Sequence, residues 1–263
     1  MDKTIKRQPG PFRTEQLRSG DAYELSRGHP ILREPTGGRG SRANRAGAQV
    51  LGTDPAVDAV GVDTGYALSA DTLRAPDVAV GNRPDRPGWV QGAPPLAVEY
   101  ADTGQDEREL QLKIAELLAA GTQWVWVVRL GMPRQVEVHA PGQPLQVLRA
   151  GDELAAPGVL RNTIPVQALY DEDAANAATL RNLLQRAGYE SLRAAGEAEG
   201  IDEGVLRGLR QAVISVAEAK GLALDPPQHE RVEACRDHAE LEQWLRGVGT
   251  AASAAVIADL FSR

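Results

Sequence analysis

The sequence predicts an α/β (α+β) domain, in which helices flank a mixed β-sheet, followed by an all-α appendage. Three observations lead to this prediction. Strand-like segments dominate residues 57–150, one amphipathic helix interrupts them, and the chain beyond residue 170 has helical spacing. A length of 263 residues exceeds one small domain and falls short of two large ones. We expect a flexible basic N-terminus at 1–19, a main domain at 20–170 and a helical appendage at 171–263.

The first elements of the main domain follow from turns and spacing. Alternating apolar residues predict a short strand pair at 22–25 and 31–32. A turn with three glycines at 35–41 then leads into a helix at 42–51. The turn lacks the Gly-Lys-Ser/Thr ending of a nucleotide-binding loop, so the glycines do not indicate a nucleotide site.

The strands of the main domain surround one helix. Strands are expected at 60–68, 76–80, 95–100, 124–128, 135–139 and 145–148. The helix is expected at 106–120, where Leu110 and Ile114 lie on one apolar arc, and Gly121 is a suitable end. A helix placed between such strands packs on the sheet that they form.

The appendage is expected to consist of helices. Helical spacing runs from residue 173 to about 220, and two shorter helices follow the Pro226-Pro227 pair at 230–235 and 239–246. Trp244 and Leu245 are expected in a small core or in a contact between two copies of the chain, in preference to a nucleic-acid surface. A homodimer is therefore one of the expectations.

Composition excludes several classes of protein. Apolar residues make up 42% and charged residues 25%, as in globular proteins. No segment approaches the roughly 18 to 20 apolar residues of a membrane helix, so neither a membrane protein nor an exported one is expected. The single cysteine, Cys235, makes no internal disulfide and no cysteine-rich zinc site, which favours a cytoplasmic protein. The four histidines are dispersed, so any metal is expected to have oxygen ligands.

Charge is unevenly distributed along the chain. The net charge is −7, yet residues 1–50 contain ten Lys or Arg and five Asp or Glu. A basic segment on an acidic protein can approach a phosphate backbone, and the alternative is a solvated N-terminus. An acidic remainder is compatible with carboxylates grouped around a divalent cation.

Two strands each carry one carboxylate beside an alanine. Alternation places Asp77 and Ala79 on one face of the first strand, and Ala97 and Glu99 on one face of the second. If these strands are neighbours, the two carboxylates converge where the alanines leave room. Hydrated Mg²⁺ prefers one or two carboxylates together with water and phosphate oxygens. For Asp77 the alternative is an aspartate at a strand start.

A lysine follows on the next helix. Lys113 lies fourteen residues after Glu99, on the flank of the apolar arc, and can reach inward. Beside metal-bound carboxylates a lysine can orient or deprotonate an attacking water, or stabilise charge in the transition state. The alternative is a lysine whose stem covers the core while its ammonium stays in water.

Taken together, these residues resemble the restriction-endonuclease-like PD-(D/E)xK superfamily, and more closely its Uma2 family, the DUF820 proteins. Further motifs similar to that family are Tyr23-Glu24-Leu25, the turn Pro35-Thr36-Gly37-Gly38-Arg39, Asp63-Thr64-Gly65, Arg74-Ala75-Pro76-Asp77-Val78-Ala79 and Pro94-Pro95. The resemblance covers about residues 20–165. In the Uma2 family the lysine lies on the helix and not two residues after the glutamate, and position 101 of this chain is accordingly Ala101.

The resemblance implies a restriction-endonuclease-like core and a metal-dependent endonuclease that acts on DNA. Its site would use Asp77 and Glu99 as ligands of Mg²⁺ or Mn²⁺, Lys113 as the catalytic lysine and Glu24 as an accessory acidic residue. For Glu24 the alternative is an exposed glutamate in a short element.

The chain also departs from the family. Relatives often have a histidine after the Gly-Gly-Arg turn, and this chain has Gly40-Ser41; a Ser-Pro-Ser type turn is replaced by Ala101-Asp102-Thr103. These departures leave a second hypothesis open, a catalytically inactive nuclease-fold protein that acts as a binding or assembly module. A third hypothesis is a helical scaffold that carries an incidental α/β domain.

Overall fold

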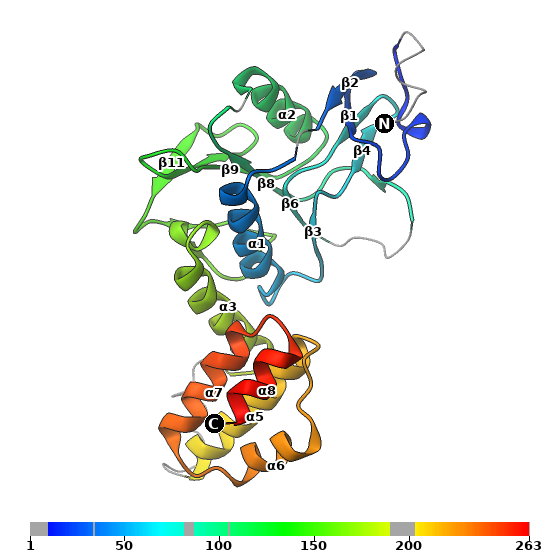
Figure 1. Ribbon diagram of the computed structural model, residues 1–263. Helices are drawn as coiled ribbons and strands as arrows, with labels where there is room; N and C mark the ends of the chain where they lie inside the picture. The colour runs from blue at the N-terminus through cyan, green and yellow to red at the C-terminus, as the bar shows by residue number, and fades with distance from the viewer. Residues whose placement is uncertain (1–9, 34, 82–86, 105, 190–202, 263) are drawn as a thin grey trace. The chain divides into compact units, whose positions relative to one another are not determined.

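The computed structural model describes residues 10–33, 35–81, 87–104, 106–189 and 203–262 (Figure 1). The chain forms two compact units. The first comprises Met1–Gly52 with Ala56–Ala175, and the second comprises Thr53–Pro55 with Asn176–Arg263. The division falls at residue 175, slightly beyond the boundary that the sequence predicts at 170.

The larger sheet of the first unit has six strands. In spatial order they are β11 (Gln146–Arg149), β10 (Gln135–His139), β9 (Trp124–Arg129), β8 (Leu96–Ala101), β6 (Val78–Val80) and β3 (Val60–Val62). β8 and β9 run parallel, and the other neighbouring pairs are antiparallel. Parallel neighbours need a crossover connection, and the helix α2 (Glu107–Ala119) provides it (Figure 1). The predicted mixed sheet flanked by helices is confirmed.

A second sheet brings the N-terminal strands into the same unit. Its order is β2 (His29–Leu32), β1 (Tyr23–Ser26), β5 (Thr72–Arg74), β4 (Tyr66–Ser69) and β7 (Val90–Gln91). β1 and β2 form the predicted hairpin, with Arg27 and Gly28 at positive φ in its turn. β5 follows β4 in the chain, and Asp77 lies between β5 and β6. The chain therefore passes from the five-stranded sheet to the six-stranded sheet in the segment that contains Asp77.

The prediction of one strand at 60–68 is wrong. Asp63 adopts a φ of +51°, a conformation that interrupts extended pairing. β3 before it pairs with β6 in the six-stranded sheet, and β4 after it pairs with β5 in the other sheet. Alternation alone could not reveal this break, because both halves keep an apolar pattern.

Helices cover the two faces of β8. Residues Ala97 and Ala101 pack with Leu110 and Ile114 of α2, so the odd-numbered positions of β8 face that helix. On the opposite face, the hydroxyl of Tyr100 reaches Gly47 of the helix α1 (Gly38–Gly52). The strand carboxylate at position 99 therefore lies on the α2 side of the sheet.

The compact unit begins before residue 20. Phe12 and Leu17 are each 4% exposed and pack with Leu25 and Leu73, on either side of the 3-10 turn η1 (Thr14–Gln16). Of the segment expected to be flexible, 1–9 lies outside the described residues, and Phe12 and Leu17 belong to this cluster.

The last elements of the first unit are a two-stranded sheet, a 3-10 helix and the first residues of helix α3. β12 (Glu153–Leu154) pairs with β13 (Ile164–Pro165), and the 3-10 helix η2 (Val166–Leu169) then packs on α1. Helix α3 (Glu172–Arg186) starts in this unit and continues into the second.

The second unit is built from helices, as predicted. They are α5 (Glu203–Ala219), α6 (Pro226–Ala234), α7 (His238–Thr250) and α8 (Ala254–Ser262), together with the later turns of α3. Trp244 and Leu245 are 3% and 1% exposed in its core, and Trp244 packs against Phe261 with ring centroids 5.0 Å apart. They fill a small core, and a homodimer stays a prediction. Part of the predicted helical stretch, 190–202, lies outside the described residues.

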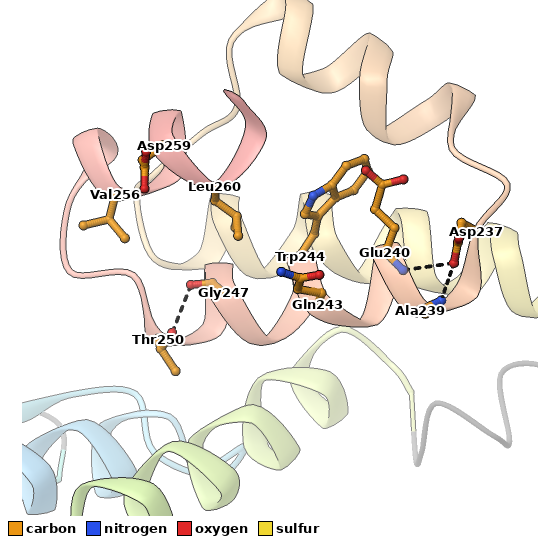
Figure 2. Close-up of a pocket in the computed structure, with 10 residues that line it drawn as sticks. All are labelled: Asp237, Ala239, Glu240, Gln243, Trp244, Gly247, Thr250, Val256, Asp259 and Leu260. Carbon is orange, nitrogen blue, oxygen red and sulfur yellow. Dashed lines mark hydrogen bonds between the residues drawn. The ribbon is translucent and has the colours of Figure 1, made fainter. Parts of the chain in front are cut away.

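A cavity of about 600 Å³ opens between α7 and α8 (Figure 2). Acidic residues, Asp237, Glu240 and Asp259, share its lining with the apolar Trp244 and Leu260. None of the site residues predicted from the sequence lines it. In the part of the chain that the structure describes, no helix has the length and apolar character needed to cross a membrane.

Candidate active site

Asp77 and Glu99 meet across two neighbouring strands. β6 and β8 are antiparallel, with Val78 opposite Val98 and Ala79 opposite Ala97. Continuing this register by one residue places Asp77 opposite Glu99, and directly opposed residues have their side chains on one face of the sheet. The Tyr100 amide donates to Asp77 Oδ2 at 2.7 Å, which fixes the aspartate at the start of β6. The predicted convergence of the two carboxylates is thus what the pairing produces.

Lys113 reaches these residues from α2. Its Nζ donates to Glu99 Oε2 at 2.9 Å and to the carbonyl of Ala75 at 2.8 Å. The lysine side chain is 12% exposed, so the ammonium lies among protein oxygens. The alternative in which only the stem is buried does not describe this residue.

Glu24 completes the group from β1. It is 4% exposed, which corrects the alternative of an exposed glutamate. Its Oε1 accepts from Lys113 Nζ at 3.2 Å, and Arg33 Nε lies 3.5 Å from the same oxygen. Glu24 therefore belongs to the same cluster as the two carboxylates and the lysine.

Sequence reasoning missed a buried arginine beside this group. Arg74 is fully buried and pairs with Glu24, Glu109 and Glu116 at 2.6 to 3.2 Å. Two signals were present in the sequence. Arg74 opens the segment that contains Asp77, and Glu109, Lys113 and Glu116 follow the spacing of one helix face. Neither signal shows that the arginine side chain points inward.

One polar cavity of about 480 Å³ contains the predicted site. Glu24, Asp77, Glu99 and Lys113 all line it, and so does Arg33. Its wall includes residues 35–37 before α1, Gly40 in the first turn of α1, and the loop after β8. The helix begins at Gly38, inside the segment predicted as a turn at 35–41. The structure therefore brings together every site residue predicted from the sequence.

Burial and charge shift the acidities of these groups in different directions. Burial raises the pKa of Glu99 to about 8, the Lys113 ammonium opposes the rise, and the Asp77 and Glu24 carboxylates add to it. Burial also raises the pKa of Asp77. Burial raises the pKa of Glu24 too, but Lys113, Arg74 and Arg33 outweigh it, and the net pKa is lowered. Burial lowers the pKa of Lys113, but the carboxylates of Glu24, Glu99 and Asp77 prevail and raise it.

The carboxylates of the cavity are possible ligands of a divalent cation. Within the described ranges, no three side chains of His, Cys, Asp or Glu form a group able to hold a metal ion. Mg²⁺ does not require three, because one or two carboxylates with water and phosphate oxygens complete its shell. Asp77 and Glu99 supply carboxylate oxygens to one cavity, although Lys113 Nζ already lies 2.8 Å from Glu99 Oε1. Asp77 and Glu99 therefore fit a hydrated ion.

The mixed sheet flanked by helices is a nuclease-like fold. A crystal structure of a protein from Anabaena variabilis ATCC 29413, described as a putative nuclease belonging to DUF820, has this fold. It matches with a TM-score of 0.54 and 17% sequence identity, over 63% of this chain and 99% of that chain.

The chain belongs to the Uma2 family. The family model, described as a putative restriction endonuclease, matches residues 12–167, more than half of the chain. The resemblance found in the sequence is confirmed, and the match begins at residue 12, which is the buried Phe12. No curated protein matches the sequence.

Proposed function

We propose that this protein is a metal-dependent endonuclease that hydrolyses phosphodiester bonds in DNA, with Mg²⁺ or Mn²⁺ held by Asp77 and Glu99. One observation carries the proposal. Four side chains from separate elements, Glu24, Asp77, Glu99 and Lys113, line a single polar cavity. Membership of the Uma2 family and the nuclease-like fold support it.

The residues have distinct roles in this proposal. A divalent cation would polarise a phosphoryl oxygen and lower the pKa of a water molecule. The raised pKa of Lys113 keeps its ammonium protonated near neutral pH, so it would donate to the charge that develops on phosphate oxygens instead of acting as a base. Glu24 is the accessory residue, because it accepts from Lys113 and keeps the ammonium at the cavity.

Arginines near the cavity mouth support an anionic substrate. Arg33 lines the cavity and its side chain is 32% exposed. Arg39, at the start of α1, is 46% exposed and pairs through two nitrogens with Asp102, which also lines the cavity. A guanidinium fork suits phosphate oxygens, so both residues are candidate contacts to the DNA backbone.

A cleavage assay tests the proposal. The purified chain is incubated with supercoiled and single-stranded DNA in Mg²⁺, in Mn²⁺ and in excess chelator. Cleavage is expected with either metal and is expected to be lost in Asp77→Asn and Glu99→Gln, which preserve side-chain shape. Glu153→Gln, a similar change at an exposed strand position, is the matched control and should cleave normally.

Metal titration separates this proposal from an inactive binding or assembly module. Calorimetry should detect Mn²⁺ binding to the wild type and much weaker binding to Asp77→Asn. A wild type that binds no Mn²⁺ and cuts neither DNA would refute the proposal and favour the inactive module. Binding without cleavage would leave the metal site in place and exclude DNA as the substrate under those conditions.

A further inference from the structure

Arg74 has no role in the chemistry above, yet its guanidinium meets three carboxylates at the end of β5. Nη1 donates to Glu24 Oε2 at 3.2 Å and to Glu109 Oε1 at 2.6 Å, and Nε donates to Glu116 Oε2 at 2.6 Å. The side chain is 0% exposed. Burying charges is so unfavourable that such a group is weak evidence for added stability. Its geometry therefore calls for another explanation.

Two of the three carboxylates bracket Lys113 on α2. Glu109 lies four residues before it and Glu116 three residues after it, and this spacing places all three on one face of the helix. Ser26 Oγ donates to Glu116 Oε1 at 2.6 Å and fixes that carboxylate from β1 as well. Arg74 thus holds the helix surface on both sides of Lys113.

The third carboxylate connects Arg74 to the lysine directly. Glu24 uses Oε2 for Arg74 and Oε1 for Lys113. The carbonyl of Ala75, the next residue in the chain, accepts from Lys113 Nζ at 2.8 Å. A displacement of Arg74 would therefore move two of the acceptors that hold the ammonium.

We propose that Arg74 is a positioning residue for Lys113: its forked guanidinium holds Glu24 and both flanks of Lys113, and so sets where the ammonium lies beside Glu99. The inference rests on the proposed function. Lysine cannot replace this arginine, because an ammonium is a point charge on a flexible stem and lacks the planar fork that spans three carboxylates.

Arg74→Lys is the test variant, because it keeps the charge and removes the fork. Arg129→Lys is the matched control. Arg129 also ties α2 to the sheet through a forked pair, with bonds to Glu107 at 2.7 and 2.8 Å and to Glu137, and no bond of it to Glu24 or Lys113 occurs in the described part of the chain. The two variants therefore make the same chemical change at two strand arginines that bind carboxylates of the same helix, α2.

Three quantities are measured on each variant: the single-turnover cleavage rate, the Mn²⁺ affinity, and the nuclear magnetic resonance signal of the Lys113 ammonium in lysine-labelled protein. The chain has four lysines, so the signal is assigned by its absence in Lys113→Arg. Arg74→Lys should lower the rate by about 100-fold, the size expected for a misplaced catalytic group. Mn²⁺ affinity should be unchanged, and the Lys113 signal should shift or broaden.

The outcomes separate this inference from the proposed function. An unshifted Lys113 signal together with wild-type cleavage in Arg74→Lys would overturn the inference, and so would an equal loss of cleavage in Arg129→Lys. If the wild type cuts no DNA, the proposed function fails, and the Lys113 signal alone then decides whether Arg74 positions the lysine. If Arg74→Lys does not fold, Glu109→Gln and Glu116→Gln each remove one flank and are judged by the same criteria.

Discussion

Lys113 donates a hydrogen bond to Glu24 at 3.2 Å, although 89 positions separate the two residues in the chain. The same ammonium donates to Glu99 at 2.9 Å. One helix lysine therefore joins a strand of the five-stranded sheet to an inner strand of the six-stranded sheet. Because these groups are buried, their charges interact more strongly than they would in water.

Removing the Lys113 charge should impair both cleavage and stability. Lys113→Met leaves Glu24 and Glu99 without their shared cation, and breaking a buried pair costs about 3 kcal/mol. The free energy of unfolding, measured by denaturant titration, should fall by that order. Mn²⁺ should recover more stability in this variant than in the wild type, because the ion replaces the missing positive charge.

A second lysine provides the control for that variant. Lys220 in the helical unit donates to the carbonyls of Val248 and Gly249. Lys220→Met should lower stability to a smaller degree and leave cleavage intact. Full cleavage by Lys113→Met would remove Lys113 from the mechanism.

Gly47 should be intolerant of any side chain. A Cβ at this position would overlap the Tyr100 hydroxyl, whose residue donates its backbone amide to Asp77. Gly47→Ala should therefore destabilise by about 1–3 kcal/mol, as overpacking in a core does. Gly38→Ala in the same helix meets no atom within 4 Å and is the control. Equal melting temperatures for the two variants would contradict this packing.

The first unit should fold without the helices of the second. Residues Glu24, Asp77, Glu99 and Lys113 all belong to the first unit, and that unit has its own buried clusters. A chain that ends at Ala175 should keep one cooperative thermal transition, followed by circular dichroism, and should keep its Mn²⁺ affinity. A gradual transition in the shortened chain would show that both units depend on one core.

Acid should weaken the ion pair between Glu107 of α2 and Arg129 of β9. Hydrogen bonds from Arg129 and Gln111 lower the pKa of Glu107 to about 2. Because the folded pKa lies below the unfolded one, the stabilisation is present above pH 4.5 and is lost as the pH falls toward 2. Glu107 is 55% exposed, so the effect should stay below about 1 kcal/mol.

Chemical denaturation at several pH values measures this contribution. Glu107→Gln should be less stable than the wild type at pH 7, and the difference should shrink steadily as the pH falls below 4.5. A difference that stays constant down to the lowest pH at which both proteins fold would show that Glu107 contributes through packing instead of charge.

Much of the fold and of the candidate site was predictable from the sequence because the patterns involved are local. Alternation placed Asp77 and Glu99 on matching faces, and helical spacing predicted α2 with Lys113 on it. The resemblance to the Uma2 family added Glu24. The break at Asp63 was missed, since a single residue with positive φ leaves the apolar alternation on both sides unchanged.

The tertiary structure alone decided how the charges are paired. No local period specifies that Arg74 binds Glu24, 50 positions away, as well as Glu109 and Glu116 on α2. Such contacts arise where two sheets and a helix close around one cavity, and they depend on strand order and register. The sequence determined which residue types stand at the candidate site, because residue type and local spacing are encoded position by position. Their partners depend on long-range packing, because burial removes water and requires each charge to find its counter-charge within the protein.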